Sequence, residues 1–433
     1  MKRPIIITLL IAALLLVLGG IAAVIFFTVR GGNFFQEGNQ PFATLEESKT
    51  VKVDAKSPVT LKVIDDAGSV TIVGADVKTV QVKVTKIAHA PTQARAEEEV
   101  KDVKYSIDQL GNTVTIKYDL PNTTVLDMNL NIVDFVVTVP IETTVDVDDN
   151  LGEVSVAGIK GKAVIANDFG SVTVDNIEGG LSVSNNNGEV NATSIQAGSE
   201  DIDLNSEFGS ITLKNADGND IILDSNSGTI TLREVRATGD ITTKTDFGNT
   251  AFENGSGNSL SIKTNNGAVA LTKVRASKEI KVEDEFGEIE LEQAFAASYD
   301  LHTNGGSITV DGAKGKLKAH TEFGGIKIGN AQAVTLDLKT NNGTVDFSGS
   351  LDTGPHLVNS DFGEISLTLP TDSKLSVDLK TEFGTIKSDL PITVTLNGTS
   401  NSNGDQIVGS INGGGEQLTV QTNSGSVNIN ASK

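Results

Sequence analysis

A repeated triplet, in which an acidic residue is followed by Phe and Gly, limits the possible folds of this 433-residue chain more than any other feature. It occurs seven times, and its Phe and Gly residues are Phe169, Gly170, Phe208, Gly209, Phe247, Gly248, Phe286, Gly287, Phe323, Gly324, Phe362, Gly363, Phe383 and Gly384. The separations between successive Phe residues are 39, 39, 39, 37, 39 and 21 residues. A second series alternates with the first: Asn187-Gly188, Ser227-Gly228, Asn266-Gly267, Asn304-Gly305 and Asn342-Gly343. The repeating unit is therefore a rung of about 19–20 residues, which is typical of a solenoid.

Each repeated Gly is followed by a short stretch in which apolar residues alternate with polar ones. Val172 and Val174 show this pattern, as do Ile211 and Leu213, and an alternation with period two predicts a half-buried strand. Two or three strands per rung cannot bury their apolar side alone, and a rung is too short for a crossover helix. The chain is therefore predicted to be all-β, a single-stranded β-solenoid (β-helix). At about 4.8 Å per rung, about fifteen rungs would form a rod on the order of 70 Å long.

The repeat also gives expectations for its own residues. The repeated Gly is predicted to adopt a positive φ at a corner. We expect the Phe side chains to fill the core, one in every second rung and so about 10 Å apart along the axis. The alternation breaks between Phe362 and Phe383, and Pro370 and Pro391 lie in the same stretch, which indicates terminal rungs that protect an exposed sheet edge.

The pattern divides the chain into five segments. These are a cytoplasmic tip and transmembrane signal anchor (1–30), a linker (31–43), an N-terminal cap with the first irregular rungs (44–150), regular solenoid repeats (151–353), and terminal rungs with a C-terminal cap (354–433). Within the N-terminal cap we expect strands at 59–63, 69–73, 80–84 and 135–140, a short helix starting at 91–92, and a hairpin of 103–107 with 113–118.

Residues 5–29 contain no charged residue and are rich in Ile, Leu, Val, Ala and Phe. A helix of this length can cross a hydrocarbon core of about 30 Å. Lys2 and Arg3 precede it and only Arg30 follows, so the positive-inside bias predicts a cytoplasmic N-terminus and an extracytoplasmic remainder. A cleaved signal peptide is the alternative, but its apolar region is usually about 7–15 residues long. The lipid bilayer is thus a predicted partner of residues 5–29, at the cell membrane.

Charge and composition exclude several classes of function. Fifty-six acidic residues against 34 basic ones give a net charge of −22, which disfavours nucleic acid as a partner. The chain has no Cys, which excludes disulfides, thiol catalysis and Cys-based metal sites.

The layout resembles the bacterial putative-adhesin family of membrane-anchored β-strand-repeat proteins, whose domain has no assigned biochemical function. The resemblance rests on GSVTI at 68–72, VVTVP at 136–140, LGEVSV at 151–156 with Gly158 and Gly161 after it, LTLP at 367–370, TEFG at 381–384 and TNSGSV at 422–427, and it spans roughly residues 50 to 430. It implies a β-helix at the cell envelope and brings no catalytic residues with it.

No other motif points to chemistry. The acids before the repeated Phe, such as Asp168 and Glu207, would lie about 10 Å apart, too far to share one cation, and are interpreted as a solvated acidic edge. His302 and His320 are one rung apart and could be neighbours, but they lack a third metal ligand. The only tyrosines that could serve as sugar platforms are Tyr105, Tyr118 and Tyr299.

The sequence thus predicts no catalytic residue, cofactor or metal site. The leading hypothesis is a membrane-anchored extracytoplasmic β-solenoid that acts as an adhesin-like or structural interaction module, with an unknown protein or glycan partner at the cell surface. The alternatives are a polysaccharide-binding or polysaccharide-cleaving β-helix protein, in which clustered carboxylates would perform the chemistry, and an envelope-stress signalling component.

Overall fold

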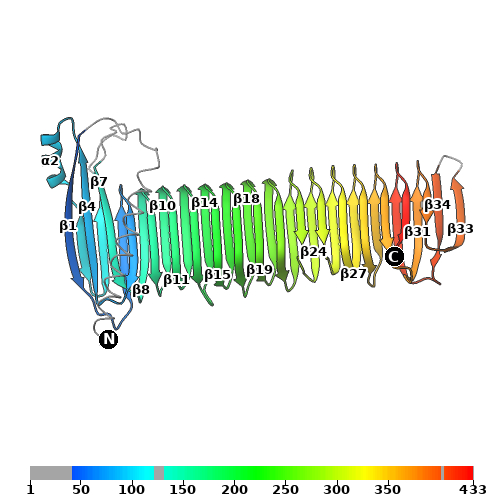
Figure 1. Cartoon of the computed structure of the whole chain (residues 1–433), viewed down its shortest axis with the longest axis horizontal. Helices are drawn as coiled ribbons and strands as arrows, with labels where there is room; N and C mark the ends of the chain where they lie inside the picture. Colours follow the sequence, from blue (N-terminus) through cyan, green and yellow to red (C-terminus); the bar gives the residue numbers. More distant parts are fainter. Residues whose placement is uncertain (1–40, 121–130, 401–403, 433) are drawn as a thin grey trace, which may run out of the picture.

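The computed structural model describes residues 41–120, 131–400 and 404–432, and these form a long rod of stacked strands (Figure 1). Within these ranges no helix is long and apolar enough to cross a membrane. The predicted anchor at 5–29 and most of the predicted linker lie outside the described residues.

Within the described ranges the elements follow one another as a long series of short strands with one helix. The N-terminal elements are β1 (Phe42–Lys52), β2 (Val59–Asp65), β3 (Val70–Ala75), β4 (Thr79–His89), α2 (Gln93–Asp102), β5 (Ser106–Leu110), β6 (Thr113–Tyr118), β7 (Ile132–Pro140), β8 (Thr143–Leu151) and β9 (Val154–Ile159). The central strands are β10 (Ala163–Phe169), β11 (Val172–Glu178), β12 (Leu181–Asn187), β13 (Val190–Gln196), β14 (Ile202–Phe208), β15 (Ile211–Gly218), β16 (Ile221–Ser227), β17 (Ile230–Ala237), β18 (Ile241–Phe247), β19 (Thr250–Gly257), β20 (Leu260–Asn266), β21 (Val269–Ala276), β22 (Glu279–Asp284), β23 (Ile289–Glu292), β24 (Ser298–Thr303), β25 (Ile308–Asp311) and β26 (Gly315–Thr321). The C-terminal strands are β27 (Ile326–Thr340), β28 (Val345–Leu351), β29 (His356–Ser360), β30 (Ile365–Leu369), β31 (Leu375–Thr381), β32 (Ile386–Ser388), β33 (Ile392–Ser400), β34 (Gly404–Ile411), β35 (Glu416–Thr422) and β36 (Val427–Ala431).

Each rung of the rod consists of two strands, and equivalent strands of successive rungs pair in parallel. Thus β10 pairs with β12 and β12 with β14, while β11 pairs with β13 and β13 with β15. The register brings equivalent residues together, for example Leu181 with Ile202 and Val190 with Ile211. The structure therefore confirms the predicted β-solenoid, and it assigns two strands to each regular rung.

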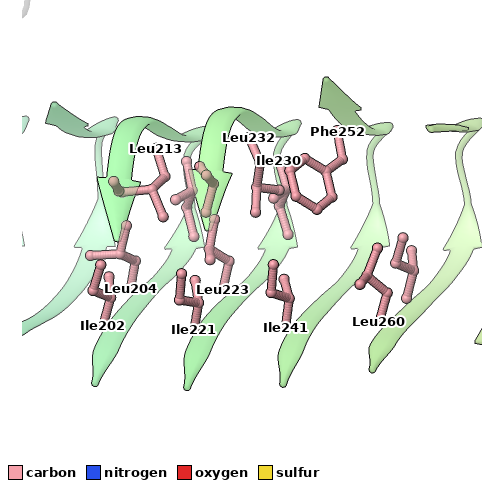
Figure 2. Packing of buried hydrophobic residues seen from close by; sticks show 14 of the residues in the cluster. Ile202, Leu204, Leu213, Ile221, Leu223, Ile230, Leu232, Ile241, Phe252 and Leu260 are labelled. Carbon is pink, nitrogen blue, oxygen red and sulfur yellow. The ribbon is translucent and has the colours of Figure 1, made fainter. Parts of the chain in front are cut away.

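The core between the two sheets is mainly aliphatic, although Phe135, Phe252 and Phe347 are also buried. Ile202 and Leu204 of β14 and Ile211 and Leu213 of β15 are fully buried, and equivalent residues stack on them from rung to rung (Figure 2). The expected Phe-filled core is wrong, because all seven repeated Phe side chains are exposed. In β14 the alternation of buried and exposed residues stops after Ser206, where the chain turns, so that Glu207 and Phe208 both point outward.

The repeated glycines stack on one another at this corner. A Cβ on any stacked glycine after Gly68 would collide with the carbonyl oxygen of the glycine one rung away, so close backbone approach is what requires Gly here. The predicted positive φ is found at Gly170 and Gly188, but not at the other repeated glycines that the structure describes. The stack runs, in spatial order, through Gly68, Gly152, Gly170, Gly188, Gly209, Gly228, Gly248, Gly267, Gly287, Gly306, Gly324, Gly343, Gly363, Gly425 and Gly384.

The N-terminal end is closed by a different arrangement. β1 pairs antiparallel with β4, and β4 pairs antiparallel with β7, so parallel stacking stops there. Helix α2 begins after its N-cap Thr92, close to the predicted start, and packs against β1 and β4. The predicted hairpin is formed by β5 and β6, but β5 starts at Ser106 and not at Val103, because Val103 caps the C-terminal end of the helix.

At the C-terminal end the order of rungs in space differs from their order in the chain. β35 pairs with β29 on one side and with β31 on the other, and β36 lies in the same way between β30 and β32. The last rung of the chain is thus inserted between two earlier ones. Beyond it, β34 pairs antiparallel with β31 and with β33, which closes this end.

Candidate interaction surface

Seven phenylalanines lie in a row along one corner of the rod. Their exposed fractions are between 53% and 64%, which is unusual for so large an apolar side chain. We call this surface the aromatic edge and define it by Phe169, Phe208, Phe247, Phe286, Phe323, Phe362 and Phe383 with the acidic residue that precedes each of them. Twelve rung-to-rung steps separate the first Phe from the last, so the row is about 58 Å long.

Small or polar residues separate the phenylalanines. Phe169 and Phe208 each pair in register with Asn187, and Phe247 pairs with Ser227 and with Asn266. The glycine stack corrects the predicted register of one rung, because Gly306, not Gly305, continues the stack. Gly305 therefore takes the position between Phe286 and Phe323, and the ring of Phe286 lies against it.

The inserted C-terminal rung restores the alternation that seemed broken in the sequence. Gly425 lies between Gly363 and Gly384 in the stack, so Ser424 separates Phe362 from Phe383. The Phe residues consequently remain two rungs apart, about 10 Å, over the whole length of the edge.

The acids that precede the phenylalanines alternate with asparagines. The Asn186 amide donates a hydrogen bond of 2.6 Å to Asp168, the Asn265 amide donates to Asp246 at 3.0 Å, and the Asn423 amide to Asp361 at 3.3 Å. Asn150 donates in the same way to Asp66 at the N-terminal end of the row. Because a neutral residue separates successive carboxylates, each negative charge avoids a like charge in the next rung, and these aspartates also gain a hydrogen bond.

A buried row of polar side chains supports the edge from inside the rod. It consists of the residues three positions before each stacked glycine. Except for Asp65, Asp149 and Asp284, their side chains donate hydrogen bonds to the glycine carbonyl oxygens. Asn167, for example, donates to the carbonyls of Gly152 and Gly170, and the Thr321 hydroxyl donates to the carbonyl of Gly306 at 2.8 Å. Sequence analysis missed this row, although a small polar residue recurs at this position and could have revealed it.

Carboxyl groups occupy this buried row in two neighbouring rungs at its N-terminal end. Asp65 and Asp149 pair in register, and each is only 1% exposed. One oxygen of Asp65 and both oxygens of Asp149 have no hydrogen-bond partner among the described residues. Burial, followed by the charge of Asp149, raises the pKa of Asp65 to about 8. Burial and surrounding carboxylates raise the pKa of Asp149 to about 8 as well.

The histidines serve local structure. His302 and His320 are neighbours in adjacent rungs, as predicted, but His302 contacts Asn304 and His320 contacts Asp337. His356 is buried between a backbone donor at Leu336 and the carbonyl of Asp352, and burial lowers its pKa.

The described part of the chain contains no group of three or more His, Asp or Glu side chains that could hold a metal ion. Successive carboxylates of the aromatic edge lie about 10 Å apart, whereas paired carboxyls in glycosidases lie about 5–9.5 Å apart. Of the predicted sugar platforms, Tyr118 and Tyr299 are buried, and the Tyr105 hydroxyl donates to Glu47.

A capped solenoid of stacked two-strand rungs defines the class of β-solenoid repeat proteins. Within that class, the chain belongs to the Toastrack family of domains of unknown function (DUF4097). The family matches the chain twice, over residues 60–255 and 253–430. This confirms the resemblance drawn from the sequence. No curated protein matches the chain.

Several solved structures are similar in parts to this chain. A putative adhesin from Bacteroides fragilis shares 15% identity over 67% of this chain and 99% of its own, with a TM-score of 0.29. A putative adhesin from Parabacteroides distasonis shares 13% identity over 70% of this chain and 97% of its own, with a TM-score of 0.26. A putative cell adhesion protein from Clostridium sporogenes shares 10% identity over 90% of this chain and 100% of its own, with a TM-score of 0.19. TM-scores this low carry no argument about function.

Proposed function

We propose that this protein is an adhesin-like interaction module, anchored in the cell membrane through residues 5–29, that presents the aromatic edge outside the cell. The single observation that carries the proposal is the row of seven exposed phenylalanines. The anchor is supported by the uncharged apolar segment at 5–29 and by Lys2 and Arg3 before it.

The exposed Phe side chains are not needed for folding. Equivalent corner positions in the intervening rungs carry Asn187, Ser227, Asn266, Gly305, Asn342 and Ser424 with the same backbone path. A regularly spaced line of exposed apolar side chains along the rod indicates an interaction site, because apolar area that the fold leaves in water becomes favourable to bury against a partner.

The rod itself fits this role. Each rung contacts its neighbours only, so the length of the edge is set by the number of repeats. Contacts that are individually weak then act together along one line, which increases the overall affinity for an extended partner.

The experiment compares cells that display the full chain with cells that display the triple variant Phe208→Ser, Phe247→Ser, Phe286→Ser. We expect the triple variant to reduce retention of cells on purified cell-wall and host-matrix surfaces by about tenfold or more. The matched control is Ile222→Ser, which removes an exposed apolar side chain from the flat face of β16. Retention that is equal for the triple variant and the native chain would refute the proposed edge.

The anchor is tested in the same strains. The native chain should remain in the membrane fraction and be digested by protease added outside the cell, whereas a variant without residues 5–29 should lose membrane association. A native chain that is released into the medium would contradict the anchor and favour cleavage.

A further inference from the structure

We propose that the aromatic edge binds an extended β-1,4-linked glycan, neutral or amine-bearing, with one disaccharide for every two rungs. This inference rests on the proposed function, because it requires the edge to be a binding surface. It adds the chemical class of the partner and the register in which the partner lies.

The first argument is the spacing of the aromatic side chains. Equivalent positions in adjacent rungs are about 4.8 Å apart, so successive phenylalanines repeat at about 9.6 Å. An extended β-1,4-linked glycan turns by half a rotation at each sugar and repeats with every disaccharide, at nearly this length. Every second sugar would thus meet a Phe ring with the same face. An extended peptide repeats every two residues, about 6.7 Å, and would lose register within a few contacts.

The second argument is the combination of chemical groups. The axial C–H groups of a pyranose form an apolar patch that packs on the face of an aromatic ring. Beside every Phe lies a carboxylate, such as Glu207 next to Phe208, and beside every intervening residue lies an asparagine, such as Asn226 next to Ser227. Carboxylates accept hydrogen bonds, and amides donate as well as accept them, so the row can satisfy sugar hydroxyl groups in alternation. A carboxylate has about four lone-pair sites, and at Asp168, Asp246 and Asp361 an Asn neighbour uses one of them.

The third argument is charge. Seven carboxylates line the edge, and the whole chain carries a net charge of −22. A second copy packed edge to edge would bring two rows of carboxylates together, and anionic lipids and nucleic acids would be repelled in the same way. The partner must therefore be neutral or positively charged. A β-1,4-linked glycan can be neutral and also provides the two-rung repeat.

The experiment measures binding of the soluble part of the chain, residues 41–433, to defined oligosaccharides by calorimetry. The probes are β-1,4-linked oligomers of glucose, of N-acetylglucosamine and of glucosamine, each as a dimer and as a hexamer. A β-1,3-linked glucose hexamer is the matched control for linkage. We expect one of the β-1,4 hexamers to bind at least about tenfold more tightly than its dimer and than the β-1,3 hexamer.

Variants test whether the bound sugar lies on the edge. The triple Phe→Ser variant should weaken hexamer binding by about tenfold or more, whereas Ile222→Ser should leave it unchanged. If the glucosamine hexamer binds best, its affinity should fall with added salt, because the carboxylates then contribute charge attraction. Circular dichroism and thermal melting of each variant show that the rod is intact.

The outcomes separate this inference from the proposed function. If the triple variant abolishes cell retention but no β-1,4 hexamer binds, the edge is an interaction surface with another partner, and the glycan inference is overturned. The same conclusion follows if the β-1,3 hexamer binds as tightly as the β-1,4 hexamers. If the triple variant changes neither retention nor sugar binding, both proposals fail.

Discussion

At the scale of single residues, each position of the buried polar row requires a side chain that can donate a hydrogen bond. The backbone at the corner is glycine, and its carbonyl oxygens need donors because water cannot reach them. Asn, Ser and Thr provide such donors, as in the bonds from Ser206 to Gly188 and from Thr340 to Gly324. A carboxylate cannot donate, so Asp65 and Asp149 meet this requirement only when they hold a proton.

The stability of the N-terminal rungs should therefore fall as the pH rises. An Asp in the unfolded chain has a pKa of about 3.9, and in the folded chain the pKa of Asp149 is about 8. Between these values the folded state binds more protons than the unfolded state, so stability is complete below about pH 4 and is lost toward pH 8. The substitution Asp149→Asn supplies a permanent donor, and we expect it to stabilise the rod at pH 8 by about 1–3 kcal/mol and to have little effect at pH 4.

Thermal unfolding of the native chain and of Asp149→Asn at pH 4.5, 6 and 8 measures this effect. The matched control is Asp175→Asn, because Asp175 is exposed on the outer face of β11 and is not among the carboxylates that raise the pKa of Asp149. A native chain and an Asp149→Asn variant with the same pH dependence would show that the buried carboxyl has an ordinary pKa.

At the scale of elements, the sequence predicted strands well because the period-two pattern is local. The predicted strand at 59–63 is β2, and the hairpin near Gly111 is formed by β5 and β6. The same local rule failed at Phe208, since alternation from Ser206 would place the Phe inside. The chain turns there because glycine backbones pack against each other between rungs, and that contact joins residues about 20 positions apart. No local pattern contains this information.

The glycine stack makes two adjacent glycines of one turn differ in their tolerance of a side chain. A Cβ on Gly324 would collide with the carbonyl of Gly306, whereas a Cβ on Gly325 would meet the Thr344 carbonyl at 3.4 Å, an ordinary contact. We expect Gly324→Ala to destabilise the rod by about 1–3 kcal/mol through forced backbone movement. Gly325→Ala should change stability by only about 0.5 kcal/mol. Denaturant unfolding of the two variants measures this difference, and equal losses would mean that the close approach does not select glycine.

At the scale of the whole molecule, contacts between distant parts of the chain organise both ends of the rod. β2 pairs with β8, which places Asp65 beside Asp149 although 84 positions separate them. At the other end β35 lies between β29 and β31. The sequence showed only that the alternation breaks between Phe362 and Phe383. The rung that repairs it lies in a later part of the chain, so the acidic pair and the continuous aromatic edge could be found only from the pairing of strands.

Removal of residues 416–433 tests how the inserted rung orders this end. The deletion leaves β29 and β31 without the strand that joins them, and β31 retains only its antiparallel partner β34. We expect the hydrogen-exchange protection factors of the β31 amides to fall by at least about tenfold, which corresponds to a decrease of ~1.4 kcal/mol in the free energy of opening. The amides of β14 should keep theirs, because each rung is held by its neighbours.

Direct docking of β31 on β29 would preserve the protection and contradict this expectation. The alternation along the edge opposes such docking. It would bring Phe383 directly beside Phe362 and Glu382 beside Asp361, with no asparagine between the two carboxylates to donate a hydrogen bond. Like charges directly opposite in a sheet are destabilising by roughly 0.2–1 kcal/mol. A rung that carries Phe and an acid therefore requires a neutral neighbour. Because the deletion removes Asn423 and Ser424, the end of the rod should open and not close again in a shorter register.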